Sequence, residues 1–441
     1  MGVIDVAIHA RAYARGEVRE VYVGVTGSEI VYVGEKPVEA GVTIDLPSQY
    51  VVLPGLADIH VHLRDFELSY KEDAVSGTEA ALAGGFVALG DMPNTKPPIK
   101  TIDLLRRKIE EFGRKTSIHL RHYFGAPPDP SILGEARDAG AHAVGEVLPE
   151  EVGEYGGDKY LDALFREAAR AGLTVIMHCE DPVILAQYNG PRDFNHHNEV
   201  RSPRAELACI HNVIRLVYRY GTKVHITHVT LPQSIYIIRS SNLDITFDVT
   251  PHHMFLSQEE CLARADKPGY CKVNPPLRDE ATRRELLAMF VRGEVPIVAS
   301  DHAPHAEWEK DRPYDEAPPG IVGLETTAPL LLTLWRRGLT TIGTVMRAIQ
   351  ERPMRFLGFN IAVSQGSCAD LVVINTKVRH TIDPTKFKTK AKYTPFKGFE
   401  VDIGIAATIL HGKLAYINPD LIEGGLAEAL ERGFGKPMVF K

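Results

Sequence analysis

The sequence lacks the features that mark several protein classes. Its five cysteines are odd in number and scattered, and none forms a Cys-x-x-Cys pair, which argues against a structural zinc ribbon and for a reducing compartment. No apolar run approaches the length of a membrane span, and Asp5 interrupts the first apolar stretch, so no membrane association and no signal peptide are expected. These absences predict a cytoplasmic protein.

Sequence features typical of nucleotide binding, nucleic-acid binding and serine hydrolases are also missing. The chain has no Walker A motif and no Gly-x-Ser-x-Gly elbow. Its formal net charge of -7 gives no reason to expect a nucleic-acid partner. The short basic run at 377–392 is interleaved with threonine and is typical of a solvated loop.

Length and composition favour a large globular chain. With 441 residues, 44% hydrophobic and 24% charged, it fits one large barrel-type domain and a smaller one. From residue 50 onward, short apolar runs alternate with amphipathic segments such as 104–112, 158–171, 205–220 and 281–292, which is typical of βα units. Eight strands are predicted, at 51–62, 86–94, 118–124, 143–147, 174–178, 224–228, 245–250 and 297–301.

Both chain ends read instead as β structure. Short strands are predicted near the start at 5–8, 20–25 and 29–34, and near the end at 370–374, 406–410 and 412–416. The simplest assembly joins them in one small β-sandwich, although two separate β pieces fit the pattern equally well. The expected fold is therefore α/β, a (β/α)8 TIM barrel at 53–360 with a small β-sandwich built from 1–52 and 361–441.

A His-x-His pair lies at the end of the first barrel strand. Side chains alternate along a strand, so His60 and His62 project from the same face, with a spacing that suits one metal ion. Arg64 continues this face and offers a guanidinium suited to a carboxylate. Alone, so short a motif is equally consistent with two structural histidines.

Three further candidate ligands stand at the ends of later strands. His178, His228 and Asp301 end the fifth, sixth and eighth strands, and in a parallel barrel these ends face one pocket. Imidazoles with a carboxylate suit zinc first, with manganese, cobalt or iron as alternatives. The set predicts a metal site.

Several motifs together resemble the dihydroorotases, members of the amidohydrolase superfamily. They are His-Val-His-Leu-Arg-Asp (60–65), Asp-Met-Pro-Asn-Thr (91–95), Thr-Pro-His-His (250–253), Val-Asn-Pro-Pro-Leu-Arg (273–278), Ala-Ser-Asp-His-Ala-Pro-His (299–305) and Pro-Gly-Ile-Val-Gly-Leu-Glu-Thr (319–326). The resemblance covers nearly the whole chain. Related hydantoinases and allantoinases share the metal ligands but typically lack Arg64 together with Asn94.

The resemblance implies a function and a role for each residue. It implies reversible ring opening of dihydroorotate to N-carbamoyl-aspartate in pyrimidine synthesis, with two zinc ions. His60, His62 and Asp301 would bind one ion, and His178 and His228 the second. Asp301 would also move the proton as base and then acid. The substrate contacts would be Arg64, Asn94, Asn274 and His305, closed over by backbone groups of 319–323. A homo-oligomer, or association with another pyrimidine-pathway enzyme, is compatible with this reading.

One position departs from the family. Its members bridge the two metals from the fourth strand with a carbamylated lysine or an aspartate, and this strand has no lysine. Glu146 falls at the position and could supply the bridging oxygen. Alternatively, a single metal binds and Glu146 orients a water or a histidine. His142 is a weaker candidate. The missing lysine also motivates a third reading, a non-catalytic homologue that acts as a scaffold.

Other residues near these motifs are not predicted to bind the metal or the substrate. His196 and His197 lie in a polar stretch and are expected to be exposed, whereas His252 and His253 follow the seventh strand and receive no role. The acidic segment 306–318, which contains Trp308, is expected to form a mobile loop over the site.

Overall fold

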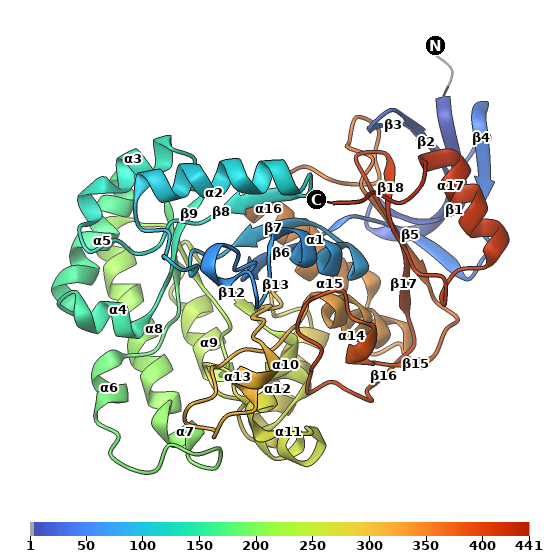
Figure 1. Ribbon diagram of the computed structural model, residues 1–441. Coiled ribbons are helices and arrows are strands. Elements are labelled where there is room, and N and C mark those ends of the chain that lie inside the picture. The colour runs from blue at the N-terminus through green and yellow to red at the C-terminus, as the bar shows by residue number, and fades with distance from the viewer. Residues whose placement is uncertain (1–3, 441) are drawn as a thin grey trace.

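The computed structural model describes residues 4–440. Its central feature is a set of eight short strands that alternate with helical segments along the chain (Figure 1). These strands are β6 (Leu56–Val61), β7 (Phe86–Asp91), β8 (His119–His122), β9 (Ala143–Val147), β10 (Thr174–Met177), β11 (Val224–Ile226), β12 (Ile245–Val249) and β13 (Ile297–Val298).

The eight strands pair in parallel and in sequence order. One sheet contains β6 to β8 and another contains β9 to β13. Isolated parallel bridges join Phe124 to Val144 and His302 to Val61, so the two sheets meet at both edges. The strands therefore close on themselves, and we call this set the parallel ring. The predicted α/β class is confirmed, and each ring strand lies within a predicted range, although the range 51–62 holds two strands. The carboxyl ends of the strands meet at one side of the ring.

Helices of amphipathic sequence cover the ring. In α2, Leu105, Lys108 and Phe112 are buried at helical spacing. Asp279 caps α12, accepting a hydrogen bond from the Thr282 N–H at 2.8 Å. The longer helices are α1 (Ala74–Ala83), α2 (Ile102–Lys115), α5 (Asp158–Ala171), α8 (Pro203–Tyr220), α9 (Pro232–Ser240), α12 (Glu280–Val291) and α14 (Leu324–Arg336).

The strand predicted at 51–62 is two strands. β5 (Tyr50–Pro54) pairs with β14 (Leu371–Asn375), outside the ring, and only β6 enters the ring. The change occurs at Gly55, where a Cβ atom would lie 2.3 Å from Val87 Cγ2. The apolar run is continuous in sequence, so the sequence alone does not show that its two halves belong to different sheets.

Both chain ends join in one eight-stranded sheet, which we call the end sheet. Figure 1 shows its first strands in blue beside its last strands in red. Its order is β18-β17-β14-β5-β1-β2-β3, with β4 on β1. The members are β1 (Ile4–Ala14), β2 (Glu17–Thr26), β3 (Glu29–Gly34), β4 (Ala40–Asp45), β5, β14, β17 (Gly404–Leu410) and β18 (Lys413–Ile417). The predicted strands at both ends are confirmed, and the sandwich domain and its boundaries stay predictions.

The end sheet packs through alternate side chains of its central strands. Val51 and Leu53 belong to the core of the ring, whereas Val52 joins a second core with Leu430 and Phe434 of α17 (Gly424–Phe434). The sheet is thus buried on both faces. Among residues 4–440, no helix combines the length and apolar character needed to cross a membrane.

Candidate metal centre

The first strand end and the last bring three predicted ligands together. His60 Nε2 lies 3.2 Å from His62 Nε2. Asp301 Oδ1 lies 3.0 Å from His62 Nε2 and 3.3 Å from His60 Nε2. All three side chains are buried. Two imidazoles and a carboxylate thus converge on one point at the carboxyl end of the ring.

Glu146 lies between this group and the other two histidines. Its Oε1 is 2.9 Å from His178 Nδ1 and 2.7 Å from His228 Nε2. Its Oε2 faces the first group and lies 3.8 Å from His60 Nε2. Each carboxylate oxygen therefore faces a different cluster of histidines, as a group shared by two cations would.

The strand holds Glu146 in this place through a neighbouring glycine. Gly145 has a φ of +119°, and a Cβ atom there would lie 2.2 Å from the carbonyl oxygen of Ile176. A side chain at 145 would therefore push β9 away from β10 and displace Glu146 from the histidines.

The donor set fits cations in chemistry as well as in position. His62 Nδ1 donates to Asn94 Oδ1 at 2.7 Å, and His178 Nε2 donates to Glu180 Oε2 at 2.6 Å. In this tautomer of neutral His62, Nε2 carries a lone pair that faces the Asp301 carboxylate at 3.0 Å. A cation between a lone pair and a carboxylate relieves this repulsion, and a carboxylate behind the histidine is the usual support of a metal ligand.

Burial and charge shift the pKa values of the same groups. Burial lowers the pKa of His60 to about 4, which favours the neutral, ligating form. Burial raises the pKa of Asp301, but His60 and His62 outweigh it and hold the pKa below its ordinary value. For His178, burial lowers the pKa, whereas the bonds to Glu146 and Glu180 raise it to about 9. Asp301 is thus ionised at neutral pH, and His178 carries a proton that a bound cation would displace.

A cavity of about 380 Å³ opens directly onto this cluster. Eight of the ten predicted site residues line it: His62, Arg64, Asn94, Glu146, His178, His228, Asn274 and Asp301. His60 lies against His62 and Asp301. His305 is the exception, because it lies beside Arg64 and is not part of the cavity wall.

Arg64 is a buried cation on the cavity wall. Its Nε donates to the Pro304 carbonyl at 3.3 Å, and Nη2 lies 3.3 Å from His305 Nε2. His305 also lies 3.0 Å from the Pro319 carbonyl, and burial lowers its pKa to about 3, so the ring is neutral. Among residues 4–440, no carboxylate forms an ion pair with Arg64. Its charge is therefore available to an anion in the cavity.

Comparisons with known proteins agree with the geometry. A family model described as the amidohydrolase family matches residues 51–260. A dihydroorotase of Pyrobaculum aerophilum is 38% identical over 379 residues, which cover 86% of this chain and 91% of that protein. The chain belongs to the dihydroorotase family of amidohydrolases. A dihydroorotase of Thermococcus kodakarensis is 31% identical over 421 residues, covering 95% of this chain and 96% of the relative.

Solved structures support the fold of this family member. An L-hydantoinase (dihydropyrimidinase) from Arthrobacter aurescens superposes with a TM-score of 0.86 at 23% identity, covering 96% of this chain and 98% of that one. A dihydropyrimidinase from Brevibacillus agri gives 0.80 at 19% identity, with 95% of each chain covered. At these identities the likeness is one of fold.

Two charged residues of the site escaped prediction. Arg201 lines the cavity and forms an ion pair of 2.6 Å with Glu180, which in turn holds His178. Both lie in segments without a recognisable motif, and Glu180 is only two residues beyond His178. A charged residue so close to a ligand at a strand end was the available signal. Glu180 neutralises the charge of Arg201, so this charge is less available to an anion in the cavity than the charge of Arg64.

Three minor predictions need correction. His142 Nε2 bonds to the Phe356 carbonyl at 2.9 Å, outside the metal cluster, so it is no bridge candidate. His197, expected to be exposed, is partly buried and contacts the Asn274 amide at 3.0 Å. Part of 306–318 folds as α13 (Glu307–Lys310), and Lys310 is fully buried, with Nζ 2.9 Å from the carbonyls of both Pro318 and Gly320. This segment is anchored on the site.

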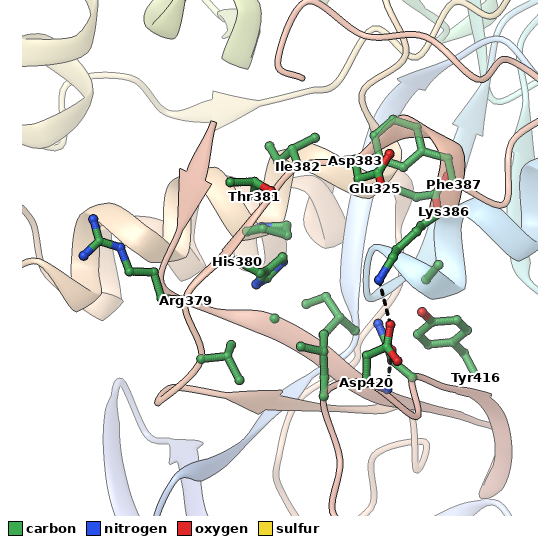
Figure 2. Close-up of a pocket in the computed structure, with 17 residues that line it drawn as sticks. Glu325, Arg379, His380, Thr381, Ile382, Asp383, Lys386, Phe387, Tyr416 and Asp420 are labelled. Carbon is green, nitrogen blue, oxygen red and sulfur yellow. Dashed lines mark hydrogen bonds and ion pairs between the residues drawn. The ribbon is translucent and has the colours of Figure 1, made fainter. Parts of the chain in front are cut away.

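A larger hollow of about 540 Å³ lies between α14 and the segment 378–421 (Figure 2). Lys386 and Asp420 form an ion pair of 2.8 Å on its wall. Glu325 lies at its edge, where burial raises its pKa to about 8. None of the groups of metal-binding side chains found among residues 4–440 lies here. Size alone therefore does not identify the site.

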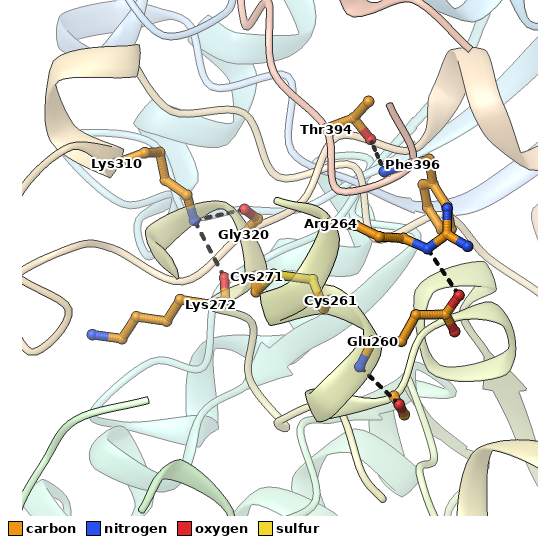
Figure 3. The surroundings of a disulfide bond; sticks show 10 residues. Glu260, Cys261, Arg264, Cys271, Lys272, Lys310, Gly320, Thr394 and Phe396 are labelled. Atoms are coloured by element: carbon orange, nitrogen blue, oxygen red, sulfur yellow. Dashed lines mark hydrogen bonds and ion pairs between the residues drawn. A yellow bond between two sulfur atoms is a disulfide. The ribbon is translucent and has the colours of Figure 1, made fainter. Parts of the chain in front are cut away.

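Four of the five cysteines pair in disulfides, although their number and spacing argued for a reducing compartment. Cys179 is disulfide-bonded to Cys209 and Cys261 to Cys271, at sequence separations of 30 and 10. Figure 3 shows the second bond just before Lys272, whose carbonyl accepts from Lys310 at 3.3 Å. Cys179 directly follows His178. Both disulfides therefore brace segments that carry site residues, and the cysteine pattern no longer argues for a reducing compartment.

Loss of the Cys179–Cys209 bond should destabilise the protein. In the chain-entropy model, a closed loop of this length contributes about 3–4 kcal/mol. We expect a Cys179→Ala/Cys209→Ala variant to unfold at a clearly lower temperature than the oxidised protein, measured by calorimetry. A Cys261→Ala/Cys271→Ala variant should show a smaller fall in unfolding temperature, because the loop that this disulfide closes is shorter. If the oxidised protein and both variants unfold at the same temperature, the two disulfides do not stabilise the protein.

Proposed function

We propose that this protein is a dihydroorotase, which interconverts dihydroorotate and N-carbamoyl-aspartate in pyrimidine synthesis. The observation that carries the proposal is Arg64, a buried guanidinium that shares one cavity with the metal-binding cluster and forms no ion pair with any residue of 4–440. A cyclic amide that bears a carboxylate could bind Arg64 through the carboxylate and present its amide to the metal-binding cluster. Hydantoin and allantoin carry no carboxylate for Arg64.

Two zinc ions would occupy the cluster. We assign His60, His62 and Asp301 to one ion and His178 and His228 to the other, with Glu146 shared between them. Zinc suits this set of imidazole and carboxylate ligands. When bound, the ions would lower the pKa of a water and polarise the amide carbonyl.

The remaining residues orient the substrate. Arg64 binds the carboxylate, helped by Asn94, whose Oδ1 is already committed to His62. Asn274 also lines the cavity and would contact the substrate ring. We assign His305 to positioning Arg64, because it touches the guanidinium and does not line the cavity.

Asp301 moves the proton. It lines the cavity and its carboxylate is ionised, so it can accept a proton from the attacking water. The same carboxyl group can then pass this proton to the leaving ring nitrogen. One residue thereby acts as base and then as acid.

The proposed domains and setting follow the sequence predictions. We propose a (β/α)8 barrel at 53–360 and a small β domain built from 1–52 and 361–441. A cytoplasmic location, a homo-oligomer and association with another pyrimidine-pathway enzyme stay predictions.

The direct test is turnover by the purified, zinc-loaded protein. Dihydroorotate should be opened, and N-carbamoyl-aspartate cyclised, much faster than hydantoin or allantoin is opened. Preference for either of the latter would identify a different cyclic amidohydrolase. No turnover, together with no bound metal after zinc addition, would favour a scaffold.

Replacing Arg64 by Met should mainly weaken substrate binding. Loss of one partner of a buried charge pair costs roughly 2–4 kcal/mol, so kcat/KM for dihydroorotate should fall about 30- to 700-fold. Arg64→Lys keeps the positive charge but loses the planar guanidinium that can donate two hydrogen bonds to a carboxylate. Its kcat/KM should therefore fall less than that of Arg64→Met. If both variants keep the wild-type KM, the carboxylate binds elsewhere.

A further inference from the structure

A second group of metal-binding side chains lies outside the cavity. One ligand atom each of His119, Cys368, Asp370 and His411 lies within 4.8 Å of the others. His119 begins β8 of the parallel ring. Cys368 and Asp370 precede β14, and His411 lies in the turn between β17 and β18. The cluster therefore joins the ring to the end sheet.

The donor atoms, counting both oxygens of Asp370, face one another at distances that suit a small cation. His411 Nδ1 lies 3.5 Å from Cys368 Sγ and 3.8 Å from Asp370 Oδ1. Zinc bonds of about 2.0–2.3 Å place tetrahedral donors roughly 3.3–3.8 Å apart. The closest pair, His119 Nε2 and Asp370 Oδ2 at 2.8 Å, would need to open by a few tenths of an ångström.

Neighbouring groups orient the donors toward this point. His411 Nε2 donates to the Ser117 carbonyl at 2.9 Å, which leaves the lone pair on Nδ1. The fully buried Asp370 carboxylate accepts from the His411 backbone N–H at 2.6 Å, which fixes one oxygen. The side chains of His119 and His411 are 20% and 33% exposed, so a cation can enter from solvent.

The ligand types indicate which cation would bind. A thiolate with two imidazoles and a carboxylate favours zinc over magnesium or calcium, which prefer oxygen ligands alone. We propose that His119, Cys368, Asp370 and His411 bind a structural zinc ion that ties the parallel ring to the end sheet. This site has four protein ligands and so leaves no position for a substrate.

Cobalt substitution tests the site separately from catalysis. The full-length protein is stripped of metal, kept oxidised and reloaded with Co²⁺. A thiolate ligand then produces sulfur-to-cobalt charge-transfer absorption in the near ultraviolet, which the cavity ligands cannot give. Among residues 4–440, Cys368 is the free cysteine, because the other four are paired. In the fully loaded protein we expect an amplitude that corresponds to one thiolate-bound cobalt ion per chain, whatever the cavity cluster also binds.

Variants identify the ligands. Cys368→Ser should abolish the charge-transfer absorption, lower the bound metal by one equivalent and leave dihydroorotate turnover at moderate temperature unchanged. His411→Gln should weaken the absorption, and His9→Gln, a histidine of the end sheet away from the cluster, should keep it. Wild-type protein without the absorption, or absorption that survives Cys368→Ser, would overturn the proposal and leave a metal-free hydrogen-bonded cluster. Neither result depends on catalysis.

Discussion

Asp301→Asn should reduce kcat for dihydroorotate by about 10²–10⁴-fold, the usual contribution of a general acid–base group. The amide has nearly the same shape, but it cannot accept a proton from the attacking water. His60 and His62 remain in place and Glu146 still faces His60, so much of the metal should stay bound. We expect the loss in kcat with a small change in KM.

The experiment needs metal analysis beside the kinetics. Steady-state rates and metal content are measured on the same zinc-loaded preparation. Asp279→Asn is the matched control, because this exposed aspartate caps α12 and asparagine caps helices equally well. Its rate and metal content should equal those of the wild type. Near-normal turnover by Asp301→Asn would rule out the proton-transfer role.

Glu146→Gln should remove one of the two expected metal ions and most of the activity. Oε1 contacts His178 and His228 and Oε2 faces His60, so a neutral amide loses the charge that both cations share. Loss of the several kcal/mol that a Lewis acid supplies corresponds to a fall in kcat of roughly 10³-fold. Metal content and kcat should fall together.

Two variants separate the bridge from other roles of Glu146. Glu146→Asp keeps the charge on a shorter side chain and should retain more metal than Glu146→Gln. Glu150→Gln is the control, since Glu150 also lines the cavity but is largely exposed and forms an ion pair of 3.5 Å with Arg201. If Glu146→Gln binds as much metal as the wild type and only kcat falls, Glu146 orients a water and does not bridge.

The sequence predicted those parts of the fold and site that follow from local periodicity. Alternation along a strand placed His60 and His62 on one face, and the shared carboxyl ends of parallel strands brought His178, His228 and Asp301 to them. Glu146 was placed by the resemblance to the dihydroorotases, because it falls where the family has a lysine or an aspartate.

What the sequence could not predict depends on contacts between distant segments. The pairings of Cys179 with Cys209 and of Cys261 with Cys271 depend on how helices pack, which spacing does not encode. Arg201 reaches the cavity only because Glu180 holds it, and the split of 51–62 depends on the close approach of Gly55 to Val87. Each depends on a tertiary contact whose partner the spacing along the chain does not identify.

The central claim is a pair of metal ions that share Glu146, and anomalous scattering at the zinc absorption edge from crystals of the zinc-loaded protein tests it most directly. We expect two peaks in the cavity cluster, one between His60, His62 and Asp301 and one between His178 and His228, with a Glu146 oxygen bound to each. A single peak, or two peaks of which neither contacts Glu146, would contradict the claim.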